Sequence, residues 1–436
     1  MVRLVSRLTL GNTLVTIQNF SEFGLADPIK RALLARKHTT PTPIQAQAIP
    51  QLLKGRDVLG IAQTGTGKTG AFALPILDRL FKIDSKTRRR DPRALILAPT
   101  RELAIQIGDD FRTYAKHLHL RHAVIFGGVS QKPQINALMR GVDIVIATPG
   151  RLLDLMGQRR VKLNSVEYFV LDEADRMLDM GFVRDVRKIT QALPKRRQAL
   201  LFSATMPGDI AKLAGEILSD PMRIEVTKQA TPVERIDQRV HHVEAKAKIP
   251  LLADVLGAPD MSRVIVFVRT KHRANRVADQ LEKRGIEVDA IHGNKSQGAR
   301  QRALKRFRAG QSRVLVATDI AARGIDVDAV SHVVNFELPN DPESYVHRIG
   351  RTARAGADGT AVSFCDAAER GYLRDIERLI GMRLAVIGGE PAGPARKQGH
   401  KPRRLNNKNN GHNKNTRRPR DKKSRINGEG RQKRAA

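Results

Sequence analysis

Short apolar runs rich in Val, Ile and Leu recur along the chain, and segments with helical spacing of their apolar residues separate them. Runs of this length, without polar alternation, are typical of strands buried on both faces of a parallel sheet. In the first half they span 58–61, 94–98, 123–126, 144–147, 169–171 and 199–202. Between two of them, residues 102–115 place Leu103, Ile107 and Phe111 on one helical face. The alternation predicts a doubly wound α/β domain.

A second set of apolar runs follows a break in this pattern. Residues 228–239 are rich in Thr, Pro, Gln and charged residues, which indicates a linker. The later runs span 264–268, 288–291, 314–317, 333–335 and 361–364. We therefore expect one α/β domain at 20–227 and another at 240–387. The two halves share no close sequence repeat, so any duplication lies at the level of the fold.

Charge then suggests the kind of partner. The 436 residues carry a formal charge of +34, and such a surface attracts polyanions, of which nucleic acid is the commonest. Residues 388–436 are expected to form a disordered basic tail, because 391–436 hold 16 Lys or Arg against two acidic residues. An anionic membrane is the rival partner, but no run of about 18 apolar residues is present to span a bilayer.

The cysteine content and the N-terminal residues bear on the location of the protein. Cys365 is the single cysteine of the sequence, which excludes an internal disulfide framework and is typical of a reducing cytoplasm. Residues 1–19 contain two Arg and no acidic residue. We interpret them as a flexible extension, and a short targeting segment is the alternative.

A glycine-rich segment after the first apolar run has the pattern of a phosphate-binding loop. Gly residues let the backbone turn so that its N–H groups face phosphate oxygens, and a Lys reaches the outer phosphates. The hydroxyl that follows the Lys is placed to bind Mg²⁺. The alternative is a Gly-Thr turn that arose by chance, although a strand before it and a helix after it favour the phosphate loop. The residues concerned are Thr64, Gly65, Thr66, Gly67, Lys68 and Thr69.

Two carboxylates follow the apolar run at 169–171. Asp172 lies where a strand-end Asp holds Mg²⁺ in nucleoside triphosphatases, mainly through water, and Glu173 is placed to polarise the attacking water. The alternative is an acidic helix start favoured by the helix dipole. Together with the phosphate loop, the pair predicts hydrolysis of a nucleoside triphosphate.

The sequence Asp172-Glu173-Ala174-Asp175 resembles the signature of the DEAD-box RNA helicases of superfamily 2, and the resemblance extends from about residue 20 to 370. The family's motifs occur in order and with family spacing. The resemblance implies two tandem RecA-like domains with doubly wound parallel sheets. It also implies RNA contacts at Pro99, Thr100, Arg101, Gly127, Gly128, Thr148, Gly150, Arg151, Arg300, Thr318 and Asp319.

The resemblance further implies an adenine site. Gln45, in Pro41-Thr42-Pro43-Ile44-Gln45, matches the Gln that reads adenine in this family, which favours ATP over GTP. Phe20 lies at the spacing of the aromatic residue that stacks on the base. Phe23 is the competing residue, and a buried core aromatic is the structural alternative. The chain departs from the family at Lys37-His38, where Gly and an aromatic residue are usual.

The second half resembles the part of the family that completes the ATP site. Arg351 and Arg354 match arginines that reach the γ-phosphate when the domains close, and Asp326 matches a ribose contact. Ala353 stands where Gly is usual, and its methyl group is compatible with the motif unless the backbone there needs a positive φ. The resemblance implies that hydrolysis is coupled to strand separation through Asp175, Ser203, Thr205 and His347.

The resulting hypothesis is an ATP- and Mg²⁺-dependent RNA helicase that grips the RNA backbone without reading sequence and opens short duplexes locally. The alternatives are an RNA chaperone, annealing or RNA–protein remodelling factor, and a superfamily 2 DNA helicase. The basic tail is similar to that of bacterial RhlE-type members. We expect a cytoplasmic monomer, with ribosome precursors or the RNA-degradation machinery as partners.

Overall fold

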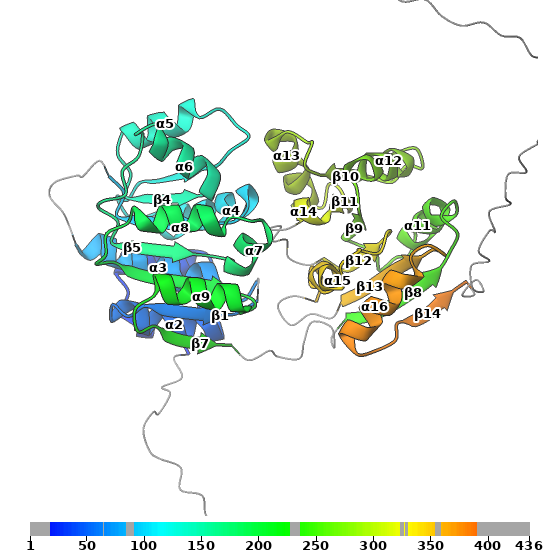
Figure 1. Cartoon of the computed structure of the whole chain (residues 1–436), viewed down its shortest axis with the longest axis horizontal. Coiled ribbons are helices and arrows are strands. Elements are labelled where there is room, and N and C mark those ends of the chain that lie inside the picture. Colours follow the sequence, from blue (N-terminus) through cyan, green and yellow to red (C-terminus); the bar gives the residue numbers. More distant parts are fainter. Residues whose placement is uncertain are drawn as a thin grey trace, which may run out of the picture. The chain divides into compact units, whose positions relative to one another are not determined.

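The computed structural model describes residues 18–63, 65–83, 91–226, 236–322, 327, 330–353 and 359–389. The expected N-terminal extension and basic tail therefore lie outside the described residues, apart from residues 18, 19, 388 and 389. Within the part of the chain that is described, no helix is both long and apolar enough to cross a membrane. Figure 1 shows two separate sheets, each accompanied by helices.

The N-terminal sheet has seven strands, all paired in parallel, in the order β3-β4-β2-β5-β6-β1-β7. Parallel neighbours need crossover connections, and helices supply them here. The strands are β1 Val58–Ile61, β2 Ala94–Leu97, β3 His122–Ile125, β4 Ile144–Ala147, β5 Tyr168–Leu171, β6 Gln198–Ser203 and β7 Met222–Glu225.

Helices cover both faces of this sheet because successive strand residues point to opposite sides. On β2, Ala94 and Ile96 pack in one core cluster, whereas Leu95 and Leu97 pack in another. The first cluster holds residues of the 3₁₀ helix η1 Phe20–Phe23 and of α1 Asp27–Ala35, α2 Pro43–Leu53, α3 Lys68–Lys82 and α4 Arg101–Tyr114. The second holds residues of α5 Lys132–Met139, α6 Pro149–Gly157, α7 Ala174–Asp179, α8 Val183–Gln191 and α9 Gly208–Ile217.

The C-terminal sheet repeats this arrangement. Its order is β10-β11-β9-β12-β13-β8-β14, again with parallel pairs throughout. Taken in chain order, β8 to β14 occupy the same sequence of places as β1 to β7. The strands are β8 Ile236–His242, β9 Val264–Val268, β10 Val288–Ile291, β11 Val314–Thr318, β12 His332–Asn335, β13 Gly359–Cys365 and β14 Ala385–Gly388.

Its helices also lie on both faces. On β9, Val264, Val266 and Val268 share a core cluster with residues of α11 and α12, whereas Ile265 and Phe267 pack with residues of α13 and α14. A third cluster joins β8 and β13 to α15 and α16. The helices are α11 Lys248–Leu256, α12 Lys271–Glu282, α13 Gln297–Arg308, α14 Asp319–Ala322, α15 Pro342–Ile349 and α16 Arg370–Ile380.

The two-domain α/β fold expected from the sequence is confirmed. All eleven expected strands are present, with ends that differ by at most two residues, and the expected helix at 102–115 is α4. Three strands were not expected: β7, β8 and β14. Since β8 begins at Ile236, it occupies the last part of the range interpreted as a linker, 228–239, and pairs with β13.

Both departures from the family's glycine pattern fall on left-handed backbone. Lys37 has a φ of 57° and Ala353 a φ of 54°. A side chain in this region brings Cβ too close to the following carbonyl oxygen, at a cost of about 1–2 kcal/mol. The condition under which the Ala353 methyl group would be costly is therefore met.

We expect Lys37→Gly and Ala353→Gly each to stabilise the protein by about 0.5–1 kcal/mol, because relief of strain exceeds the extra entropy of Gly in the unfolded chain. Urea unfolding, followed with each variant, measures the change. Lys54→Gly is the control, since Lys54 caps α2 with a φ of −79° and gains nothing from Gly. A lower unfolding midpoint for both test variants would contradict the strain argument.

Candidate active site

The phosphate loop joins β1 to α3. Gly65 and Gly67 have φ values of 84° and 89°, which glycine alone adopts without strain. Lys68 begins α3 and is buried, and its Nζ donates a hydrogen bond to the carbonyl of Ala62 at 3.0 Å. The loop therefore delivers a helix N-terminus and a buried cation to one place, an arrangement suited to phosphate groups. Thr64 lies outside the described residues.

Asp172 and Glu173 directly follow β5 and are both buried, at 2% and 3% exposure. Asp172 Oδ1 accepts a hydrogen bond from the backbone N of Glu173 at 2.9 Å. Burial raises the pKa of Asp172 to about 6, the Lys68 charge opposes the rise, and the Glu173 charge adds to it. A carboxylate in this condition is stabilised in its charged form by a cation placed beside it.

Glu173 is held in an unusual conformation. Its φ of 52° puts a non-glycine residue in the left-handed region at the start of α7. Its Oε2 accepts a hydrogen bond from Arg176 Nη1 at 2.7 Å. Backbone strain of this kind costs about 1–3 kcal/mol and persists where the surrounding structure enforces it, which happens most often at functional sites.

A pocket of about 370 Å³ brings the expected nucleotide residues together. Phe20 lines it, whereas Phe23 packs against Phe20 with ring centroids 5.7 Å apart. Thr66, whose hydroxyl donates to the carbonyl of Gln63 at 2.8 Å, is not part of the lining. The expected residues that line the pocket are Phe20, Gln45, Gly65, Gly67, Lys68, Thr69, Asp172 and Glu173.

Gln45 joins the adenine motif to the phosphate loop. Its Nε2 donates a hydrogen bond to the carbonyl of Gly67 at 2.9 Å, and its Oε1 accepts one from the backbone N of Thr42 at the same distance. Each bond uses one of the amide's two donors or one of its lone pairs. Gln45 therefore keeps one donor and one acceptor for a further partner at the pocket.

We expect Gln45→Ala to weaken ATP binding at least tenfold and to reduce the preference for ATP over GTP, because the cavity loses both an amide and a support of the loop. Titration with the two nucleotides measures the effect. Gln47→Ala is a matched control, since Gln47 lies on the same helix α2 but is exposed. Equal losses from the two variants would exclude a specific role for Gln45.

Sequence reasoning missed several residues of this pocket. Tyr114, at the end of α4, and His38, after α1, both line it, with ring centroids 6.4 Å apart. Burial raises the pKa of Tyr114 to about 12. Arg36, Thr40 and Asp110 line it as well. The spacing that places Leu103, Ile107 and Phe111 on one face of α4 also includes Tyr114, but no sequence pattern tells a pocket position from a core position.

The carboxylate of Asp175 connects the acidic motif to the loop after β6. Its Oδ2 accepts hydrogen bonds from the backbone N atoms of Ala204 and Thr205, each at 3.0 Å, and from Thr205 Oγ1 at 3.3 Å. The backbone N of Asp175 donates to Ser203 Oγ at 3.1 Å. Three of the four residues expected to couple hydrolysis to strand separation, Asp175, Ser203 and Thr205, thus form one hydrogen-bonded unit in the N-terminal domain, and the fourth, His347, lies on α15 of the C-terminal domain.

A second hollow, of about 510 Å³, gathers most of the expected RNA contacts. Gly128, Thr318 and Asp319 are the expected contacts that do not line it. Glu102, which the sequence did not suggest, lines it and accepts hydrogen bonds from Arg300 Nε at 2.7 Å and Gln297 Nε2 at 3.0 Å. The expected residues in the lining are Pro99, Thr100, Arg101, Gly127, Thr148, Gly150, Arg151 and Arg300.

Gly128 has a structural reason to be glycine. Its φ is 78°, and a Cβ at this position would collide with the guanidinium of Arg101. Arg101 is the first residue of α4, and Thr100 caps that helix by accepting a hydrogen bond from the backbone N of Leu103. Gly128 thus leaves room for the Arg101 guanidinium at the hollow.

In the C-terminal domain, Arg348 ties two expected functional segments together. Its guanidinium is 1% exposed and makes paired hydrogen bonds to Asp319, Nε to Oδ1 at 2.5 Å and Nη2 to Oδ2 at 2.8 Å. Asp319 directly follows Thr318, the last residue of β11. This ion pair anchors α15, which carries His347 and precedes Arg351, to the end of β11.

His347 and Arg351 lie on or next to this anchored helix. Burial lowers the pKa of His347, so the neutral imidazole is favoured at pH 7. Arg351 is 7% exposed, and its Nε donates a hydrogen bond to the carbonyl of His347 at 3.3 Å. Asp326 and Arg354, the remaining residues expected at the ATP site, lie outside the described residues.

Comparison with known proteins decides the family. Residues 42–213 match the family model described as DEAD/DEAH box helicase, and residues 247–356 match the helicase conserved C-terminal domain. The chain is 44% identical over 359 residues to the DEAD-box ATP-dependent RNA helicase CshA of Bacillus cereus, across 82% of this chain and 67% of that protein. The chain belongs to the DEAD-box family of ATP-dependent RNA helicases.

Other DEAD-box proteins share both sequence and fold with this chain. The RNA helicase CrhR of Synechocystis is 44% identical over 86% of this chain and 75% of its own length. S. cerevisiae Dbp5 bound to RNA and ADP BeF3 superposes with a TM-score of 0.73 at 33% identity, over 85% of this chain and 96% of Dbp5. The fold of two RecA-like domains is thus shared with solved DEAD-box structures, and assignment to the RhlE-type subgroup stays a prediction.

In this DEAD-box protein, the carboxyl ends of the N-terminal strands carry the nucleotide pocket and most of the lining of the second hollow, to which Arg300 of α13 also contributes. Expected RNA residues follow β3, β4 and β2, which are neighbours in the sheet, and expected nucleotide residues follow β5 and β1. Ser203, which ends β6, lies between these last two strands. Ligands of parallel α/β sheets bind at the carboxyl ends of the strands, so the chain offers two adjacent sites, and the Asp175 unit lies on the nucleotide side, between β5 and β6.

Proposed function

We propose that this helicase binds ATP in the pocket of the N-terminal domain and single-stranded RNA along the neighbouring hollow, and that each ligand favours binding of the other. The sheet order carries the proposal. The residues expected to bind RNA follow the neighbouring strands β3, β4 and β2, and those expected to bind the nucleotide follow β5 and β1 of the same sheet. The Asp175 unit joins the acidic motif to the loop after β6. Dbp5 bound to RNA and ADP BeF3 supports it by family likeness.

Mg²⁺ fits the residues of the pocket. Thr69, in the first turn of α3, and the buried Asp172 line the same cavity and offer oxygen ligands. Mg²⁺ is usually held by one or two such groups together with water and phosphate oxygens. Among the described residues there is no group of three or more His, Cys, Asp or Glu that could hold a metal. When bound, Mg²⁺ would neutralise charge on the phosphate oxygens.

Two buried residues of the pocket and two arginines of the C-terminal domain then have roles in hydrolysis. Lys68 moves from the carbonyl of Ala62 to the outer phosphates. Glu173 orients the attacking water and accepts its proton, since it is buried and ordered by Arg176. Arg351 and Arg354 reach the γ-phosphate from the C-terminal domain and stabilise its developing charge. Hydrolysis therefore depends on domain closure.

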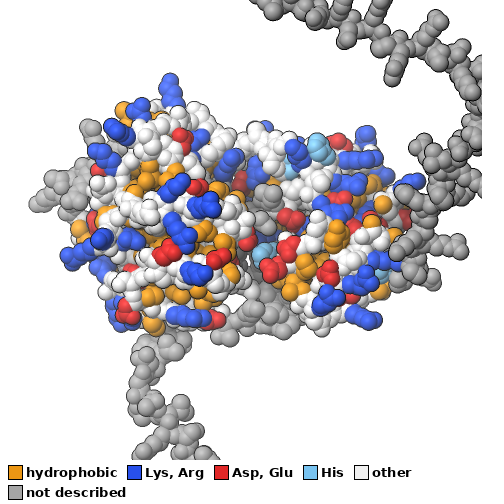
Figure 2. All heavy atoms as spheres, in the orientation of Figure 1, with side chains coloured by type: hydrophobic (Ala, Val, Ile, Leu, Met, Phe, Trp, Pro, Cys, Tyr) orange, Lys and Arg blue, Asp and Glu red, His pale blue; other side chains and the backbone are white. Residues whose placement is uncertain are grey.

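The RNA residues favour contact with the backbone of the strand. The lining of the hollow offers guanidinium groups, hydroxyl groups and glycine backbone, which bind phosphates and do not distinguish bases. Lys and Arg side chains are spread over the face of the molecule shown in Figure 2. We propose that closure bends the bound strand so that it no longer fits a duplex, and that base pairs are lost locally.

RNA-stimulated phosphate release tests the proposal. We expect the ATP hydrolysis rate of the full-length protein to rise about tenfold or more with single-stranded RNA, because RNA favours the closed state in which arginines of the C-terminal domain reach the γ-phosphate. DNA of the same sequence is the control and should stimulate less. A rate that does not respond to RNA would contradict the proposal, and equal stimulation by both strands would favour the DNA helicase alternative.

The cellular setting is a separate proposal. We propose that the protein works as a monomer in the cytoplasm on ribosome precursors or with the RNA-degradation machinery, with the basic residues of the tail holding it near structured RNA. The bacterial RNA helicases among its relatives support a role on RNA. Crosslinking in cells followed by sequencing of the bound RNA separates the two settings, and sedimentation of the purified protein tests the monomer.

A further inference from the structure

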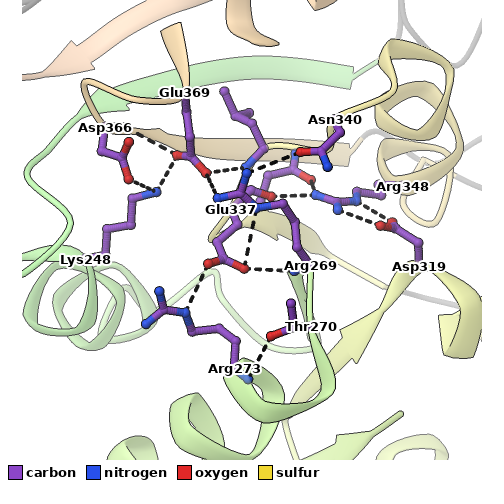
Figure 3. A network of polar contacts seen from close by, with 12 residues as sticks. Lys248, Arg269, Thr270, Arg273, Asp319, Glu337, Asn340, Arg348, Asp366 and Glu369 are labelled. Carbon is purple, nitrogen blue, oxygen red and sulfur yellow. Dashed lines mark hydrogen bonds and ion pairs between the residues drawn. The ribbon is translucent and has the colours of Figure 1, made fainter. Parts of the chain in front are cut away.

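A polar network surrounds the carboxyl ends of β9 and β12 in the C-terminal domain (Figure 3). At its centre is Glu337, which is 6% exposed. Its Oε2 accepts a hydrogen bond from the backbone N of Arg269 at 2.8 Å, and its Oε1 accepts one from Arg273 Nε at 3.0 Å. One carboxylate thus orients two arginines that lie just before and within the first turn of α12.

A hollow of about 610 Å³ opens beside this network. Arg269, Arg273 and Arg276 line it, against Glu337 as the acidic residue of the lining, so its net charge is positive. Arg273 and Arg276 are three residues apart on α12 and therefore share a face of that helix. Thr270 caps the helix by accepting a hydrogen bond from the backbone N of Arg273, so the positive end of the helix dipole faces the same region.

Arg269 forms a rigid wall of the hollow. Its Nη2 lies 3.2 Å from Glu369 Oε1, and its Nη1 donates to Asn340 Oδ1 at 3.3 Å. Its guanidinium carbon lies 5.7 Å from the centroid of the Tyr372 ring. Glu369 is itself 1% exposed and paired with Lys248 at 2.5 Å. The network therefore holds the Arg269 guanidinium in place, beside the Tyr372 ring, before any ligand arrives.

The hollow adjoins residues expected to contact RNA. Val268, the last residue of β9, is in register with Thr318 on the neighbouring strand β11, and paired strands lie about 4.8 Å apart. Arg269 follows Val268 directly. In addition, Lys271 Nζ donates a hydrogen bond to Asn294 Oδ1 at 3.2 Å, which links the start of α12 to the loop before α13 and Arg300.

From these observations we infer that the hollow is a second RNA site, which takes a phosphate and the adjoining nucleotide of RNA that extends beyond the stretch held by the N-terminal domain. Arginine forks match phosphate oxygens, and the fixed guanidinium and tyrosine ring offer planes against which a base stacks. An acidic peptide would pair with the arginines but would not stack on the guanidinium and the tyrosine ring. It would also have no reason to bind next to Thr318. The inference rests on the proposed function and extends its RNA path.

Arg276→Glu in the full-length protein tests the second site. Binding is measured by fluorescence anisotropy, with ADP BeF3 present, for a short oligouridine that fills the hollow lined by Thr100, Arg151 and Arg300 and for a longer one extended at both ends. We expect the variant to bind the longer RNA about tenfold more weakly, the loss typical of a charge-assisted contact, and the short RNA as the parent does. For the longer RNA, the slope of the logarithm of the binding constant against the logarithm of the salt concentration should become shallower by about 0.7, which corresponds to the loss of one phosphate contact.

Lys283→Glu is the matched control, because Lys283 is an exposed residue at the other end of α12 and the change in charge is the same. Arg276→Lys should restore part of the affinity, and an unchanged thermal unfolding midpoint shows that the fold is intact. An equal loss of affinity for the short and the longer RNA would contradict the second RNA site. An equal loss of affinity from Lys283→Glu would contradict it as well. So would unchanged binding of the longer RNA, the result expected if the hollow serves an acidic peptide.

The failure of this inference is distinguishable from that of the proposed function. If the hollow does not bind RNA, the parent protein still hydrolyses ATP faster with the short RNA. If the proposed function is wrong, the short RNA fails to stimulate the parent, whatever Arg276→Glu does.

Discussion

Glu173→Gln should reduce RNA-stimulated ATP hydrolysis by about 10²–10⁴-fold, the range typical of a lost general base, while ATP and RNA still bind. The amide keeps the size of the carboxylate but cannot accept the proton of the attacking water. Because Glu173 is buried, its backbone has a φ of 52° and Arg176 pairs with its carboxylate, the position of this carboxylate in the pocket is set. Phosphate release under saturating RNA measures the rate.

The control for this variant is Glu216→Gln, which removes an exposed carboxylate paired with Arg187 on the surface. It should leave the rate unchanged, since surface ion pairs contribute little. If Glu173→Gln hydrolysed ATP within a few-fold of the parent rate, Glu173 would not be the base. If the Glu173→Gln variant repeatedly separated duplexes without hydrolysing ATP, the result would favour the alternative of an RNA chaperone or annealing factor.

Arg351→Ala should reduce the hydrolysis rate by about 10³-fold or more, because an arginine finger contributes 10³–10⁵ in rate. The residue follows a helix that the Arg348–Asp319 ion pair fixes to the end of β11, so its position in the domain is set. ATP affinity without RNA should change little. Single-turnover hydrolysis with and without RNA measures the effect.

Arg378→Ala is the control, because Arg378 is 80% exposed on α16 and pairs with Asp375 within its own helix. Arg354→Ala should resemble Arg351→Ala, since both residues match the family's γ-phosphate arginines. A parent-like hydrolysis rate for Arg351→Ala would show that the pocket of the N-terminal domain hydrolyses ATP without that residue.

The fold could be predicted where strands are buried on both faces. Runs such as Ile144–Ala147 and Val264–Val268 are continuously apolar because helices cover both sides of them. β7 and β14 lie at sheet edges and are largely exposed, so their sequences lack such a run. β8 alternates buried and exposed residues along Ile236–Val240, but the central buried position is the polar Gln238, so the sequence shows no apolar alternation and resembles a polar linker.

The candidate site was predictable to the same degree. Motif residues follow strands, and the sheet order then brings them together at one edge. Contacts between residues distant in sequence could not be predicted, such as Gln45 with Gly67 or Tyr114 beside His38, because they depend on how helices pack. The strain at Lys37 and Ala353 also needed backbone angles, since the sequence shows only that glycine is absent there.

The central claim is that the ATP and RNA sites are coupled. The most direct measurement is the dissociation constant for short single-stranded RNA with and without a non-hydrolysable ATP analogue. The account predicts binding at least about fivefold tighter with the analogue, and by reciprocity the same factor for the analogue when RNA is present. Equal dissociation constants in the two conditions would contradict the coupling and the closure on which the proposed mechanism depends.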